Sequence, residues 1–162
     1  MKKTLTVALV LAAATALGVT VLAGAAATAT EPVPTVSREV LASTKVAGVP
    51  GYTLYLVRVT AMPGSLLAKH YHPGTQSVYI ESGSVRYTVY KGAARVYRGP
   101  AEAGKQPYKT IAAGQAGTIQ AGDWFVETPS LVHSAQVTSP GPFVVLLSGL
   151  LKTGAPLAIP VK

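Results

Sequence analysis

The chain has no cysteine among its 162 residues, and acidic, aromatic and histidine residues are scarce. The absence of cysteine excludes disulfide bonds, thiolate metal ligands and the attachment of a lipid to cysteine. Six acidic residues stand against 14 lysines and arginines, giving a formal charge of +8. A basic chain can bind nucleic acid, but this one lacks the interleaving of basic and aromatic residues that such binding favours. We therefore expect no nucleic-acid partner.

The first 29 residues have the composition of a secretory signal. Lys2 and Lys3 form a basic start, residues 4–22 are largely apolar and uncharged, and two Ala-x-Ala patterns suited to cleavage follow. An uncleaved membrane anchor is the alternative, because about 20 apolar residues span a bilayer. Frequent alanine and threonine make this run a poor anchor. We expect a secreted or periplasmic protein with no stable membrane span after cleavage.

The rest of the chain is long enough for one domain. Removal of residues 1–29 leaves about 133 residues and lowers the formal charge from +8 to +6. Residues 30–35 form a short proline-containing linker, and residues 36–162 form the predicted domain. Because this domain has no disulfide bonds, its stability must come from a packed core.

Short β-strand patterns separated by glycine and proline turns fill the predicted domain. β-Branched and aromatic residues dominate several runs, and no convincing amphipathic helix is present. The pattern predicts an all-β barrel or sandwich. The expected strands cover residues 38–46, 52–61, 78–80, 84–90, 118–128, 132–137 and 143–151, with one more around the first histidines.

Residues 91–117 form the least regular part of the domain and carry five lysines and arginines against one glutamate. An insertion that attracts an anion to the barrel mouth is one interpretation. A solvated loop with short edge strands is the simpler interpretation, and we prefer it.

The three histidines of the chain are the main candidates for a functional site. His70 and His72 are one residue apart, so a β-strand would project both from the same face. A third imidazole must come from another strand, and His133 is the only histidine left. Gln76 could be a weak fourth ligand or a hydrogen-bonding neighbour of the ligands. Three unrelated histidines in the core or on the surface are the alternative to a metal site.

The spacing around His70 and His72 resembles the first motif of the cupin superfamily, and the resemblance is to small, single-domain, quercetin-dioxygenase-like (type-2) cupins. Gln76 replaces the glutamate of that motif. The second motif fits less well, because Pro129 lies one place late and two usual residues are replaced. The first motif is carried by Gly64, His70, His72, Gln76 and Gly83, and the second is carried by Gly122, Asp123 and His133, with departures at Pro129, Ser130 and Val137.

The resemblance, which covers most of the chain from about residue 36 to residue 151, implies a double-stranded β-helix, or jelly-roll barrel, preceded by a signal helix. It implies that His70, His72 and His133, with Gln76 as a fourth candidate, hold one divalent transition metal ion. Imidazole ligands suit Fe, Mn, Zn, Ni and Cu, so the ligand type does not select the metal. Three ligands on one side leave coordination positions open for substrate, as in catalytic sites. A homodimer is also implied by the resemblance alone.

The replacement of glutamate by Gln76 predicts a metal site with about two positive charges instead of one. An anionic small-molecule ligand is therefore expected. We predict a dioxygenase-like enzyme acting on a small anionic or enolisable organic molecule. The alternatives are a non-catalytic cupin module that binds a small molecule or metal, and a metal-dependent isomerase or lyase. No catalytic role is assigned to Glu81, Glu127, Tyr71, Tyr79 or Tyr87.

Overall fold

The computed structural model describes residues 35–162, which form two antiparallel β-sheets. The predicted signal at residues 1–29 and nearly all of the predicted linker lie outside the described residues. Within residues 35–162 every regular element is a strand, so this part of the chain holds no helix able to cross a membrane. The predicted all-β jelly roll is confirmed.

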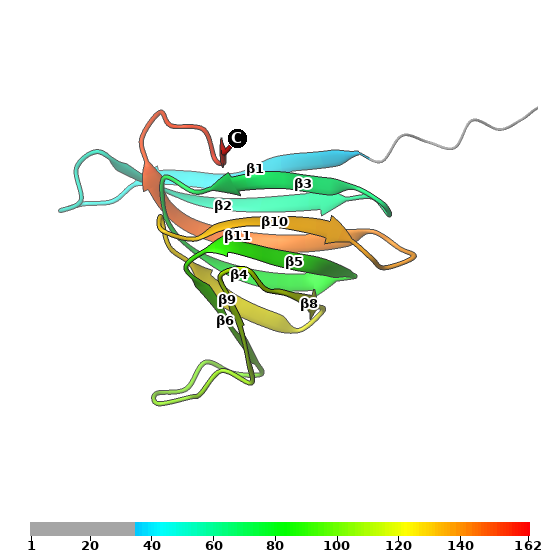
Figure 1. Cartoon of the computed structure of the whole chain (residues 1–162). Helices are drawn as coiled ribbons and strands as arrows, with labels where there is room; N and C mark the ends of the chain where they lie inside the picture. Colours follow the sequence, from blue (N-terminus) through cyan, green and yellow to red (C-terminus); the bar gives the residue numbers. More distant parts are fainter. Residues whose placement is uncertain (1–34) are drawn as a thin grey trace, which may run out of the picture. The chain divides into compact units, whose positions relative to one another are not determined.

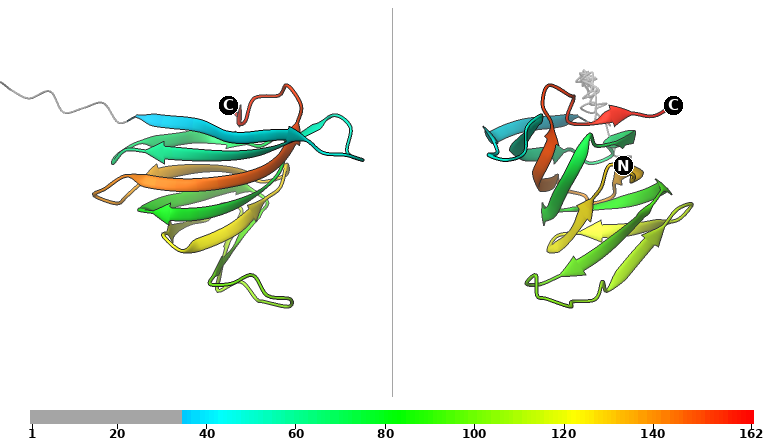
Figure 2. Two further views of the ribbon diagram at one scale, coloured as in Figure 1. Left: turned by 180° about the vertical axis from the view of Figure 1, so that it is seen from behind. Right: turned by 90° about the vertical axis from the view of Figure 1, so that its left-hand side faces the viewer.

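The larger sheet has seven strands in the order β1-β2-β11-β4-β9-β6-β7, and the smaller has five in the order β12-β3-β10-β5-β8. Figure 1 shows β3, β10 and β5 in front of the larger sheet, and the reverse view in Figure 2 shows the larger sheet in front. The strands are β1 (Val36–Lys45), β2 (Tyr52–Ala61), β3 (Leu66–Tyr71), β4 (Gly74–Ser82), β5 (Ser84–Lys91), β6 (Ala93–Arg98), β7 (Lys109–Ala112), β8 (Ala116–Gln120), β9 (Asp123–Glu127), β10 (Val132–Val137), β11 (Phe143–Lys152) and β12 (Ile159–Pro160).

The core lies between the two sheets, and the alternation along each strand decides which side chains enter it. On β4, Val78 and Ile80 are buried while Tyr79 is 49% exposed. This confirms the sequence prediction for these three residues. The core also holds Val57, Val59, Val85, Val89, Val96, Ile111, Ile119, Phe125, Val137, Phe143 and Val145.

The basic segment 91–117 contains the hairpin of β6 and β7 and the start of β8. β7 and β8 are the last strands of their sheets, as the prediction of short edge strands requires. β6 pairs with β9, which ties this hairpin to the larger sheet.

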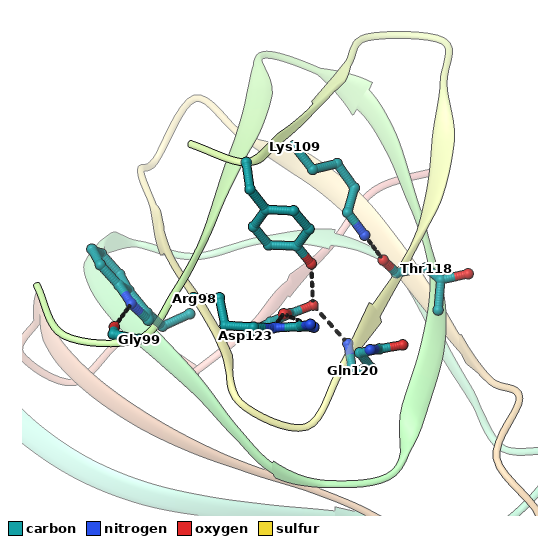
Figure 3. Close-up of polar contacts among 8 residues, drawn as sticks. Arg98, Gly99, Lys109, Thr118, Gln120 and Asp123 are labelled. Atoms are coloured by element: carbon teal, nitrogen blue, oxygen red, sulfur yellow. Dashed lines mark hydrogen bonds and ion pairs between the residues drawn. The ribbon is translucent and has the colours of Figure 1, made fainter. Parts of the chain in front are cut away.

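A fully buried carboxylate, Asp123 at the start of β9, fixes the hairpin in place (Figure 3). Arg98 donates to Asp123 Oδ1 through Nε at 3.0 Å and Nη2 at 2.5 Å. Tyr108 OH at 2.8 Å and the Gln120 backbone N–H at 3.0 Å donate to Oδ2. Both carboxylate oxygens are therefore satisfied by groups that stay donors at neutral pH.

Candidate metal centre

The three histidines lie together in the interior. His70 is on β3, His72 follows directly after that strand, and His133 is on β10 as the register partner of His70. All three side chains are buried, and one ring nitrogen from each lies within 4.8 Å of those of the other two. The prediction that these imidazoles meet is confirmed.

Backbone carbonyls fix the orientation of two of the rings. Nδ1 of His70 lies 2.6 Å from the Ala68 carbonyl oxygen, and Nδ1 of His72 lies 2.6 Å from the Leu157 carbonyl oxygen. A carbonyl only accepts hydrogen bonds, so each Nδ1 carries the proton. In the neutral rings Nε2 then has a lone pair, which is the tautomer that histidine ligands of metals commonly use.

The ring of His133 is held differently. It stacks on the ring of Tyr87, with centroids 4.8 Å apart and an interplanar angle of 15°. Within the described part of the chain its buried Nδ1 has no hydrogen-bond partner. Its Nε2 lies 3.2 Å from Glu127 Oε1, so the carboxylate and the stacking together set the direction of this ring.

Glu127, at the end of β9, is the buried carboxylate of the cluster. Its Oε2 lies 3.2 Å from His72 Nε2. It also accepts hydrogen bonds from Gln76 Nε2 at 2.6 Å and from Tyr87 OH at 2.7 Å. The expected charge of about two at the metal site did not include this carboxylate, which lies beside two of the three histidines. Alternation along β9 could have shown that Glu127 shares a face with the core residue Phe125.

Gln76 contacts the centre through Glu127. It is the register partner of Glu127 across the β4–β9 pair, and its amide nitrogen faces that carboxylate. An ideal Cβ at Gly149 on β11 would lie 3.3 Å from Gln76 Oε1, so the missing side chain there leaves room for the amide oxygen. Of the two roles expected for Gln76, the structure shows the hydrogen-bonding neighbour. Direct metal ligation by Gln76 stays a prediction.

Burial and the carboxylate of Glu127 shift the pKa values of the three histidines in different directions. Burial and the neighbouring His133 lower the pKa of His70 to about 4, and burial lowers the pKa of His133. Burial also lowers the pKa of His72, but Glu127 more than offsets this and raises it overall. Burial alone would raise the pKa of Glu127, yet His133, His72 and Tyr87 hold it well below its usual range. Glu127 thus favours a proton on His72 more than on His70 or His133.

The cluster opens into a cavity of about 70 Å³ between the sheets. That volume has room for an ion and a few waters or a small ligand. Most of the wall is apolar, and Arg38 of β1 adds a positive charge to the polar groups of the cluster. A neighbouring groove shares Arg38, His70 and Leu157 with the cavity and adds Lys69. The surroundings of the cavity are therefore cationic on the side of this groove.

The residues present fit a transition metal ion. Imidazole nitrogen and one carboxylate suit Fe, Mn, Zn, Ni or Cu, whereas Mg²⁺ and Ca²⁺ prefer oxygen ligands. The neutral tautomers of His70 and His72 are already set by the backbone. The described structure therefore supports a metal ion at this cluster without selecting which ion.

Comparisons with known proteins establish the fold. No family model matches the sequence, and no curated protein matches it. The structure resembles the polyketide cyclase RemF from Streptomyces resistomycificus, with a TM-score of 0.50 and 10% identity over 78% of this chain and 71% of that chain. It resembles a cupin 2 domain-containing protein from Halorhodospira halophila with a TM-score of 0.50 and 12% identity, over 78% and 70% of the two chains. KdgF from Halomonas sp. aligns at 20% identity and a TM-score of 0.46, over 70% and 79%. The described chain thus has the cupin fold, and identities this low carry no activity across.

Proposed function

We propose that this cupin-fold protein is a secreted, mononuclear metal-dependent enzyme, dioxygenase-like, acting on a small anionic or enolisable organic molecule. The observation that carries the proposal is the group of three buried imidazoles facing a mostly apolar cavity between the sheets. A purely structural metal site would be closed by protein ligands, whereas a catalytic site keeps positions open toward a pocket.

The residues of the chain would prepare the centre in defined ways. The Ala68 and Leu157 carbonyls hold the Nε2 atoms of His70 and His72 ready for an ion. A bound transition metal would supply Lewis-acid or oxygen-activating chemistry. The mostly apolar walls lower the local dielectric constant, which strengthens electrostatic contacts within the cavity. Tyr87 OH donates to Glu127 and keeps that carboxylate fixed beside the two imidazoles.

The expected ligand is anionic for a reason that differs from the sequence argument. Glu127 provides the negative charge that was expected to be missing, so a divalent ion in this centre would leave about one positive charge. Arg38 in the cavity wall adds another, and its guanidinium can pair with a carboxylate. The metal centre and Arg38 together present about two positive charges, so an anionic ligand that reaches both of them fits the cavity.

The test begins with the mature protein, from about residue 30, purified without chelators or a histidine tag. Its metal content is measured, and oxygen uptake is then followed with β-diketones and 2-hydroxy acids, with the His72→Ala variant as control. One equivalent of metal and oxygen uptake that the variant lacks would support the proposal. Turnover without oxygen uptake would indicate an isomerase or lyase. Saturable binding without turnover would indicate a binding module. A protein that neither carries nor takes up metal would overturn it.

Secretion and dimer formation stay predictions. Secretion is the interpretation of residues 1–29, and N-terminal sequencing of the exported protein would test it. The homodimer is implied by the family resemblance, and light scattering of the mature protein would test it.

A further inference from the structure

We propose that Glu127 supplies the carboxylate of the metal centre, in place of the glutamate that Gln76 replaces. The inference rests on the proposed metal binding and names one more residue that performs it. Gln76 and Glu127 are direct register partners on β4 and β9, and both side chains are buried. Neighbouring strands lie about 4.8 Å apart. The carboxylate therefore lies one strand away from the position of the glutamate in the motif, on the same inner face of the sheet.

The distances suit coordination beside the histidines. Glu127 Oε2 lies 3.2 Å from His72 Nε2, and Glu127 Oε1 lies 3.2 Å from His133 Nε2. Ligand atoms bonded at about 2.1 Å to one ion, at octahedral to tetrahedral angles, are separated by about 3.0 to 3.4 Å. Each of these carboxylate–imidazole contacts already has the spacing of two ligands of one ion.

The surroundings of Glu127 hold it in that position. Gln76 Nε2 donates to one carboxylate oxygen and Tyr87 OH donates to the other. Partners that orient metal ligands through such hydrogen bonds commonly contribute about 10- to 100-fold in metal affinity. Gln76 is thus a positioning residue that acts through Glu127. The bare backbone at Gly149 contributes too, since an added Cβ would lie 2.9 Å from Gln76 Cβ.

The identities of residues 76 and 127 depend on each other. A glutamate at position 76 would place a second buried carboxylate against Glu127, and two like charges at that distance repel strongly in a dry interior. Glutamine at position 76 carries no charge, and its amide nitrogen donates a hydrogen bond to Glu127 instead. A double variant that exchanges Gln76 and Glu127 should therefore keep one carboxylate and one amide, with the carboxylate on β4 and the amide on β9.

The experiment measures Co²⁺ affinity by chelator competition, together with the visible absorption of bound Co²⁺, in a set of variants. We expect Glu127→Gln to weaken binding by more than the about 100-fold that orienting partners contribute, and to change the absorption spectrum. The double variant Gln76→Glu with Glu127→Gln should regain at least part of the affinity. Glu81→Gln is the matched control, because Glu81 pairs with Arg58 on the surface, and it should behave as the wild type.

A second measurement uses only the wild-type protein, so its result does not depend on whether a variant folds. The infrared difference spectrum of metal-loaded against metal-free wild type should show carboxylate stretching bands that shift on coordination. Wild type that binds no Co²⁺ would overturn the metal-dependent function and this inference with it. Wild type that binds Co²⁺ without a carboxylate shift, or a folded Glu127→Gln variant with unchanged affinity and spectrum, would leave the function standing and overturn the role of Glu127.

Discussion

The two ends of strand β9 each bury a carboxylate, and their partners give them different roles. Asp123 and Glu127 are four residues apart on the same inner face, with Phe125 between them. Asp123 accepts from Arg98, Tyr108 and a backbone N–H. Glu127 faces two imidazoles, an amide and a phenol beside a cavity.

The difference lies in whether the positive partner can be exchanged. A guanidinium stays charged and cannot release its donors to a ligand, so the Asp123 end is a fixed anchor for the β6–β7 hairpin. An imidazole can give up a proton and accept a metal ion in its place. In this chain, the buried carboxylate with exchangeable partners lies at the candidate site, and the one with a fixed partner lies at the hairpin. Each prediction below should affect one end of β9 and leave the other unchanged.

Removal of one imidazole should have the largest effect. His72→Ala is expected to abolish stoichiometric metal binding, a loss beyond the about 100-fold that orienting partners contribute. The barrel should stay folded, because the Asp123 anchor is untouched. Metal content and circular dichroism measure the two outcomes. Stoichiometric metal in a folded His72→Ala protein would show that this imidazole is not a ligand.

Acid should destabilise the metal-free protein through the histidine end. The pKa of His70 is about 4 in the fold against 6.5 as the reference value, so the unfolded chain binds more protons between these values. Stability should thus fall as pH decreases from 6.5 to 4, by about 3 kcal/mol for a shift of this size. The lowered pKa of His133 acts in the same direction.

His72 and Glu127 affect stability mainly outside the range from pH 4 to pH 6.5. The raised pKa of His72 gives stability that is complete below 6.5 and is lost as pH rises through its folded pKa. The lowered pKa of Glu127 gives stability that is lost only at more acidic pH, below its unfolded value. Urea unfolding of chelator-treated protein measures the trend. An equally steep decline in His70→Gln would show that His70 is not its source.

A change at the anchor should cost stability and spare the metal. Asp123→Asn removes the charge that Arg98 and Tyr108 contact, and we expect a loss of about 1 to 3 kcal/mol in the free energy of unfolding. Metal affinity should stay that of the wild type. Glu102→Gln, on the exposed part of the same segment, serves as the control. A large loss of metal affinity in folded Asp123→Asn would show that the two ends of β9 are coupled.

The smallest effect is expected at the cavity wall. Arg38→Gln should weaken azide binding to the Co²⁺-loaded protein by up to about fivefold, because exposed charge pairs contribute about 1 kcal/mol or less. The effect should shrink as salt is added. Arg95→Gln, whose position on β6 lines a different groove, should leave azide binding unchanged. Equal effects of both variants would indicate a response to net charge instead of a contact.

Much of the fold could be predicted from the sequence because strand patterns are local. The alternation that buries Val78 and Ile80 is visible within one strand, and so is the shared face of His70 and His72. Glu127 was missed as a member of the site for a different reason. Its partner Gln76 is 51 residues away in the sequence, and Tyr87 is 40 residues away. No local pattern relates these positions.

Three properties could be deduced from the amino-acid sequence alone: an all-β fold, three histidines as candidate metal ligands, and a basic net charge. These follow from side-chain type and a two-residue period, which act over a few residues. Three others became visible in the folded chain: a carboxylate of β9 lies beside the histidines, Gln76 donates a hydrogen bond to it, and the Leu157 carbonyl orients a histidine 85 residues away. These contacts depend on the register between strands that are far apart in the sequence. A slip of one residue between β4 and β9 would turn Glu127 to the opposite face, and packing of the whole barrel selects the register.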